Sequence, residues 1–142
     1  MVDYENKLAS FRTIVSDLND KEFDKFKDKI KDVATSTKAS STDVAQSFEA
    51  IAGLNSSFAE TAEGLGKVSE AAITLSKASG DDLTVSTENL VSIMNQFSMG
   101  AEESNRAINV LAAGQAVGAA SISQLSESFK NVGSVAASSN IS

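Results

Sequence analysis

Apolar side chains in this chain recur at steps of three and four residues, and no proline interrupts them. The first such seam comprises Tyr4, Leu8, Phe11, Val15 and Leu18. This spacing places the side chains on one face of a helix. Proline is the commonest helix breaker, so its absence lets each periodic segment run to its own cap. No segment alternates apolar and polar residues for long enough to predict a strand. The sequence therefore predicts an all-α fold.

The first 34 residues form a charged amphipathic segment with two heptad seams. The second seam comprises Phe23, Phe26, Ile30 and Val33 and is out of register with the first. Between the seams, Asn19 followed by Glu22 three residues later is typical of a helix start. We expect residues 1–34 to be either a helical hairpin or one long helix with a register shift.

Residues 35–41 are rich in Ser and Thr and lack apolar periodicity, which predicts a linker. An Ala- and Ser-rich helical domain is expected over residues 42–142. Its predicted helix starts are Ser41 or Thr42, Ser57 with Glu60, Asp81 or Asp82, Glu102 with Glu103, and Ser121 with Gln124. Its predicted stops are Gly53, Gly80 and Gly100.

Each expected helix of this domain carries an apolar stripe. The stripes are Val44, Phe48 and Ile51; Ala62, Leu65, Ala72 and Leu75; Leu83, Leu90, Met94 and Phe97; Ile108 and Leu111; and Leu125, Phe129, Val132 and Ala136. Helices this short are not stable alone, so they must bury their stripes against one another. We therefore expect an array or bundle of short helices. Met94 and Met99 are expected to fill this core rather than to line a groove beside Phe97.

The residue types present argue against catalysis. The chain has no His and no Cys, which removes the imidazole base and the usual zinc ligands. A serine nucleophile would need a lysine as its base, and Lys67, Lys77 and Lys130 are all predicted on exposed helix faces. We expect no enzymatic activity, no catalytic residue, no cofactor site and no metal site.

Three short motifs have plainer explanations than ligand binding. The stretch "GLGKVS" at 64–69 lacks the first Gly and the final Ser or Thr of a phosphate loop, and a helix is expected there. Asp81 and Asp82 lack the spaced oxygens of a calcium loop, so one of them is expected to cap a helix. Gly114 and Gly118 fall in the small-residue stretch "AAGQAVGAAS", where a turn is expected, with close helix packing as the alternative.

The distribution of charge along the chain indicates which kind of partner the protein could bind. The net charge of −7 falls entirely within residues 39–142, because residues 1–38 hold eight basic and eight acidic side chains. An acidic body argues against binding nucleic acid and suits a basic partner. No apolar run approaches the length of a membrane-spanning helix, and no membrane contact is predicted.

Two stretches resemble the conserved helical region of tail tape measure proteins from long-tailed bacteriophages and prophages. The first is "AAITLSKASGDDLTVSTENLVSIMNQFSMGAEESNRAINVLAAG", and the second is "SISQLSESFKNVGSVAASSNIS". The ordered series of caps and glycines carries the resemblance, which covers about residues 41–142. Family turns more often carry Gly where this chain has Asn140. Residues 1–40 carry no diagnostic motif.

The resemblance implies a non-enzymatic structural role in tail assembly and tail-length determination. It also implies self-association, with tail tube, baseplate or tail-assembly chaperone proteins as further partners. The protein would then reside in the virion tail after assembly in the host cytoplasm. The alternative is a helical interaction module of a secreted effector or a chaperone-like adaptor. An assembly fragment should expose apolar side chains, whereas an independent module should have a closed core and a polar surface.

The end of the sequence contains signals for both a helix stop and a new helix start. Asn140 can follow a helix in the left-handed conformation, while Ile141 and Ser142 are typical of the residues that begin the next helix. We therefore expect the domain to be truncated at its C-terminus.

Overall fold

The computed structural model describes residues 2–118, which contain six α-helices, two 3₁₀ helices and no strand. The predicted all-α fold is confirmed. In chain order the elements are α1 (Val2–Ile14), α2 (Asp20–Thr37), α3 (Ser41–Leu54), η1 (Ser56–Ala59), α4 (Ala62–Ser79), α5 (Leu83–Gln96), η2 (Ala101–Glu103) and α6 (Ser104–Gly118).

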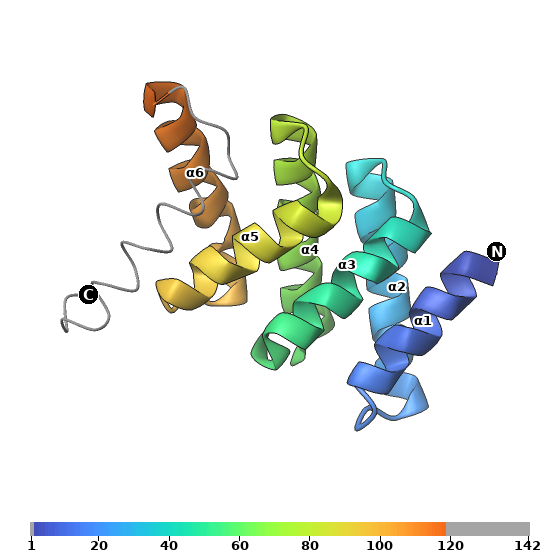
Figure 1. The fold of residues 1–142 in the computed structure, drawn as a ribbon. Helices are drawn as coiled ribbons and strands as arrows, with labels where there is room; N and C mark the ends of the chain where they lie inside the picture. Colours follow the sequence, from blue (N-terminus) through green and yellow to red (C-terminus); the bar gives the residue numbers. More distant parts are fainter. Residues whose placement is uncertain (1, 119–142) are drawn as a thin grey trace.

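The helices form two layers of an open array (Figure 1). The front layer holds α1, α3 and α5, and the back layer holds α2, α4 and α6. Each front helix turns back into the following back helix, so the array consists of three stacked helical hairpins. Stacking buries the apolar face that no single hairpin can cover alone.

The three hairpins follow a common repeat of about forty residues. Thr61, the N-cap of α4, lies 42 residues after Asn19, the N-cap of α2. Asp82 lies 42 residues after Ser40 at the starts of α5 and α3. The buried positions keep the same step, which takes Phe23, Phe26, Ile30 and Val33 of α2 to Leu65, Val68, Ala72 and Leu75 of α4. A step of 39 residues then leads from α4 to the buried Ser104, Ala107 and Leu111 of α6.

Residues 2–34 pack on the later helices as a hairpin and not as one long helix. Phe11 of α1 is fully buried, and its ring centroid lies 5.8 Å from that of Phe48 in α3. Phe23 and Phe26 of α2 complete the cluster at 5.9 and 5.8 Å from Phe11. Edge-to-face and tilted rings at these distances attract one another beyond their shared burial. A single hydrophobic core therefore joins α1 and α2 to the later helices.

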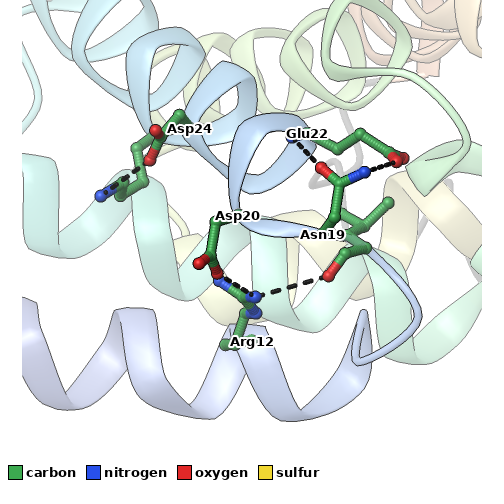
Figure 2. Close-up of polar contacts among 7 residues, drawn as sticks. Arg12, Asn19, Asp20, Glu22 and Asp24 are labelled. Carbon is green, nitrogen blue, oxygen red and sulfur yellow. Dashed lines mark hydrogen bonds and ion pairs between the residues drawn. The ribbon is translucent and has the colours of Figure 1, made fainter.

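Polar contacts fix the turn between α1 and α2 (Figure 2). The Asn19 side chain accepts a hydrogen bond from the backbone N–H of Glu22 at 2.8 Å, as the sequence predicts, and its amide donates to the Glu22 carboxylate at 2.7 Å. The guanidinium of Arg12 pairs with Asp20 at 2.9 Å and also lies 4.4 Å from the centre of the Phe23 ring. These contacts stabilise the turn at which the chain reverses, between the two heptad seams.

The predicted linker at 35–41 is shorter in the structure. Helix α2 continues through Thr37, and only residues 38–40 separate it from α3. The hydroxyls of Ser36 and Thr37 donate to the carbonyl of Val33, so these side chains are satisfied inside a helix instead of ending it. The helix ends at Lys38, whose φ of 60° is left-handed. Ser40 caps α3, one residue before the earlier of the two predicted caps.

The predicted stop at Gly53 and the predicted start at Ser57 are both wrong. Helix α3 runs through Leu54, and Gly53 has an ordinary helical backbone. Phe58 and Ala59 are buried in the 3₁₀ turn η1. Ser57 lies within this turn and therefore does not cap α4. The cap of α4 is instead Thr61, whose hydroxyl accepts from the N–H of Gly64 at 3.0 Å.

The remaining boundaries agree better with the sequence. Gly80 ends α4 with a φ of 78°, as predicted, and Asp82 caps α5. Gly100 is not the predicted helix stop, because α5 already ends at Gln96. It precedes the 3₁₀ turn that contains Glu102 and Glu103, and α6 begins at Ser104. In the described part of "AAGQAVGAAS", α6 continues through Gly114 to Gly118 where a turn was expected. One glycine within a helix costs only about 1 kcal/mol relative to alanine, so neighbouring helical residues can carry it.

Most of the predicted stripes form the core. Their fully buried members include Val44, Phe48, Ile51, Leu65, Ala72, Leu75, Leu90, Met94 and Leu111. Ala62, Leu83, Ile108 and Met99 are partly buried against this core. Phe97 differs, because 43% of its surface remains exposed after α5 ends. The stripe predicted at Leu125, Phe129, Val132 and Ala136, its cap at Ser121, and Asn140 to Ser142 lie outside the described residues.

Candidate interaction surfaces

The stretch at 64–69 and the pair Asp81 and Asp82 both belong to helices or to their ends in the described structure. The stretch 64–69 lies within the first turns of α4, so its backbone N–H groups are not arranged as a phosphate-binding loop. A carbon added to Gly66 would lie 2.7 Å from the Lys29 side-chain carbons, which shows how closely α2 approaches α4. Within the described part of the chain, no three acidic side chains are grouped closely enough to hold a metal ion.

The predicted capping role belongs to Asp82. Its carboxylate accepts a hydrogen bond from the N–H of Thr84 at 3.0 Å. The carbonyl of Asp81, by contrast, accepts from the hydroxyl of Ser76 at 2.7 Å. Asp82 therefore caps α5 with its carboxylate, and Asp81 contributes its backbone carbonyl to the same helix boundary.

Asp82→Ala is expected to lower the free energy of unfolding by about 1 kcal/mol, since the first turn of α5 loses its cap. Urea denaturation followed by circular dichroism measures this change. Asp82→Ser is the matched control, because serine also caps helices and should preserve most of the stability. A stability gain on adding millimolar Ca²⁺ to the unmodified protein would contradict the purely structural role.

The structure describes two of the three lysines that could serve as a base. Lys67 and Lys77 are exposed on α4, as predicted. The ammonium of Lys77 donates a hydrogen bond to the carbonyl of Thr37 and so ties α4 to the end of α2. Lys130 lies outside the described residues.

An acidic groove follows the back layer between α2, α4 and the start of α6. It consists of two adjoining cavities of about 460 and 440 Å³ that share Lys29, Asp32 and Glu63. Seven acidic side chains line it, against Lys25, Lys29 and Lys67: Glu22, Asp28, Asp32, Glu60, Glu63, Glu70 and Glu102. The excess negative charge predicted for the body of the protein is therefore concentrated partly on this face.

One ion pair crosses the acidic groove. The ammonium of Lys29 lies 2.8 Å from the Glu63 carboxylate and joins α2 to α4. The hydrogen bond from Lys29 and its positive charge lower the pKa of Glu63. Because Glu63 is exposed, this pair adds little to stability and mainly sets the local charge pattern.

A second surface is apolar and follows the turns at one end of the front layer. Ile14 ends α1, Leu54 ends α3, and Phe97 directly follows α5, so each hairpin contributes one large side chain. Between 42% and 46% of each side chain is exposed. Figure 1 shows these three helix ends at the same side of the array. We call Ile14, Leu54 and Phe97 the apolar edge.

Neighbouring helix ends that carry the apolar edge lie close together. The Asn55 amide donates to the Asn95 side chain at 2.6 Å, which holds the ends of α3 and α5 together. A recess of about 420 Å³ lies between the end of α1 and the α3–η1 turn, and Ile14, Val15 and Ala52 are among its lining residues. The apolar periodicity predicts a buried stripe that includes Phe97, and it does not predict exposure of Ile14 and Leu54. Ile14 and Leu54 can be recognised as exposed only from their position at the ends of helices. That position is known only once the helix boundaries are known.

No described helix is both long enough and apolar enough to cross a membrane. The arrangement defines a class of protein: a repetitive helical array whose distinctive surfaces are an acidic groove and an apolar edge.

Comparison with known families then gives a particular assignment. The profile of phage-related minor tail proteins matches residues 27–142, which is most of the chain. The chain belongs to this family and is a component of bacteriophage tails. The match begins within α2, so it includes four of the six described α-helices entirely and excludes α1. Searches of curated proteins and of solved structures gave no match.

Proposed function

We propose that this chain is a structural module of a tail tape measure protein and that it acts by self-association during tail assembly. Membership of the minor tail protein family does not by itself specify a tape measure. The match of residues 27–142 to minor tail proteins carries the proposal, and the resemblance of residues 41–142 to tape measure sequences narrows it. The tail tube, the baseplate and the assembly chaperones are further proposed partners, met in the host cytoplasm where tails are built.

The apolar edge is the surface proposed for self-association. Its three residues lie at or directly after the C-terminal ends of the three front-layer helices, so each consecutive hairpin contributes one of them. A second copy carries the same residues with the same spacing, and two such edges can pair in register around a twofold axis. Exposed apolar side chains are also the feature expected of an assembly fragment rather than of a self-sufficient module. No comparable observation favours the effector or adaptor alternative.

The association state tests this proposal. Light scattering after gel filtration, over a series of concentrations, should show the unmodified chain forming dimers or larger species. The double variant Leu54→Glu with Phe97→Glu should remain monomeric, because pairing would bury unpaired carboxylates. The control is Val85→Glu, since Val85 is 41% exposed but lies near the opposite end of α5. It should associate like the unmodified chain.

Two results of these measurements would contradict the proposal. The unmodified chain could prove monomeric at every concentration. Self-association would then be excluded. Equal loss of association in the Val85→Glu control would instead place the contact away from the apolar edge.

A further inference from the structure

The two places where the described hairpins stack on each other are built differently. We call the contact between α1–α2 and α3–α4 the first junction, and the contact between α3–α4 and α5–α6 the second junction. At the first junction the ring of Phe11 packs on that of Phe48, with their centroids 5.8 Å apart. The ion pair between Lys29 and Glu63 also crosses this junction, at 2.8 Å. The first junction therefore combines aromatic packing in the core with an ionic contact at the surface.

The repeat allows equivalent positions of α3 and α5 to be compared. The step of 42 residues that relates the starts of these helices takes Val44 and Ala45 to Ser86 and Thr87. All four side chains are buried, with at most 1% of their surface exposed. Helix α3 therefore buries only carbon atoms in the side chains at these positions, whereas α5 buries two hydroxyl groups.

Two buried hydroxyl groups at the second junction lack hydrogen-bond partners in the described structure. Thr87 of α5 and Ser47 of α3 are 1% and 2% exposed, and neither side-chain oxygen is hydrogen-bonded. Both residues line a recess of about 180 Å³ that is bordered by α1, α3 and α5. A hydroxyl that loses water on folding and gains no partner destabilises the folded state. The closed form of the second junction is therefore weakened where α3 faces α5.

Three hydrogen bonds that cross the second junction are long or exposed. The Gln46 amide donates to the Thr84 hydroxyl at 3.3 Å, and the Ser104 hydroxyl donates to the Lys67 carbonyl at 3.3 Å. Well-formed hydrogen bonds of these types are about 2.7–3.0 Å long. The shorter bond between the two asparagine side chains at the apolar edge is exposed, so water can replace it. These contacts orient α5 and α6 on the array but resist separation only weakly.

We propose that the second junction is a built-in opening point, at which α5 and α6 separate together from α3 and α4 while the first two hairpins stay packed. Separation hydrates the hydroxyls of Ser47 and Thr87 and so recovers part of the free energy that their burial costs. The recess beside them admits water as the helices part. Opening the first junction would instead expose the rings of Phe11 and Phe48, which is far less favourable.

The opening has a consequence for the surface of the molecule. Leu54 at the end of α3 and Phe97 after α5 lie on opposite sides of the second junction, so separation parts two of the three residues of the apolar edge. The junction therefore controls whether that surface is complete. The inference itself does not rest on the proposed self-association, because it concerns the distribution of stability within one molecule.

Amide hydrogen exchange of the full chain, followed by mass spectrometry, tests the role of the unpartnered hydroxyl. Thr87→Val keeps the shape of the side chain and removes the hydroxyl, so exchange in α5 and α6 should slow by about fivefold or more. Thr84→Val is the matched control, because the Thr84 hydroxyl is exposed and already bonded to Gln46. It should not slow exchange. Unchanged or faster exchange in Thr87→Val, or equal slowing in both variants, would overturn the proposal.

A substitution at the first junction tests whether the opening is separate from global unfolding. In the unmodified chain, α5 and α6 should exchange about tenfold or more faster than the most protected amides of α2 and α3. Phe11→Leu keeps an apolar side chain but weakens the first junction. It should speed exchange in α2 and α3 by about fivefold or more and leave α5 and α6 unchanged, because their opening keeps the first junction intact. Equal acceleration in all four helices would show that the array opens as one unit and would overturn the proposal.

Discussion

Replacing Phe11 by alanine is expected to lower the free energy of unfolding by about 3–5 kcal/mol. Phe11 is fully buried, and its ring contacts the rings of Phe23, Phe26 and Phe48. The substitution therefore removes one large apolar side chain and three aromatic contacts at once, and it leaves a cavity where the first two hairpins meet. Most domains have a total stability of about 5–15 kcal/mol, so the loss is a large part of the whole.

Urea denaturation monitored by circular dichroism provides the measurement. Phe97→Ala is the matched control, because it deletes the same atoms from a side chain that is 43% exposed. We expect the control to lose less than about 1 kcal/mol. Similar losses in the two variants would mean that Phe11 does not occupy the centre of a shared core.

Deleting residues 1–19, and with them α1, is expected to have a still larger effect. Helix α1 packs along α3, and its removal would expose Phe48 and the faces of Phe23 and Phe26 that contact Phe11. An end hairpin of a stacked array protects the apolar face of its neighbour, so its loss destabilises the units beyond it. The truncated chain should lose cooperative thermal unfolding or bind the apolar dye ANS strongly.

This deletion also tests where the folding unit begins. The family match starts at residue 27, and the Ser/Thr-rich composition predicts a boundary at residues 35–41. If either position marked the start of an independent domain, residues 20–142 would unfold as cooperatively as the full chain. Removing only residues 1–3, which precede Tyr4, provides the control and should change little.

Helix caps show which helix boundaries can be predicted from the local sequence. Asn19, Gly80 and Asp82 have the roles that the sequence predicts, because each contact lies within a few residues along the chain. Ser57 and Thr61 are competing candidates for the start of α4. The burial of Phe58 and Ala59 decides in favour of Thr61, and that burial depends on helices distant in the sequence.

The surfaces depend even more on the tertiary structure. Phe97 satisfies the spacing of a buried stripe, yet it is exposed because α5 ends at Gln96 and the chain turns away. Glu22 of α2 and Glu102 beside α6 are far apart in sequence, but both line the acidic groove along the back layer. Neither the apolar edge nor the acidic groove is visible before the hairpins are stacked.

The sequence by itself determined that the chain is helical, which faces of most helices are apolar, and that histidine and cysteine chemistry is absent. These properties follow from residue type and from spacing over one or two helical turns. Only the tertiary structure decided that the helices stack as hairpins with a repeat of about forty residues. The repeat preserves burial and not residue identity, as Phe23 and Leu65 illustrate. Different apolar side chains can fill equivalent positions because packing requires volume and exclusion of water rather than a particular residue.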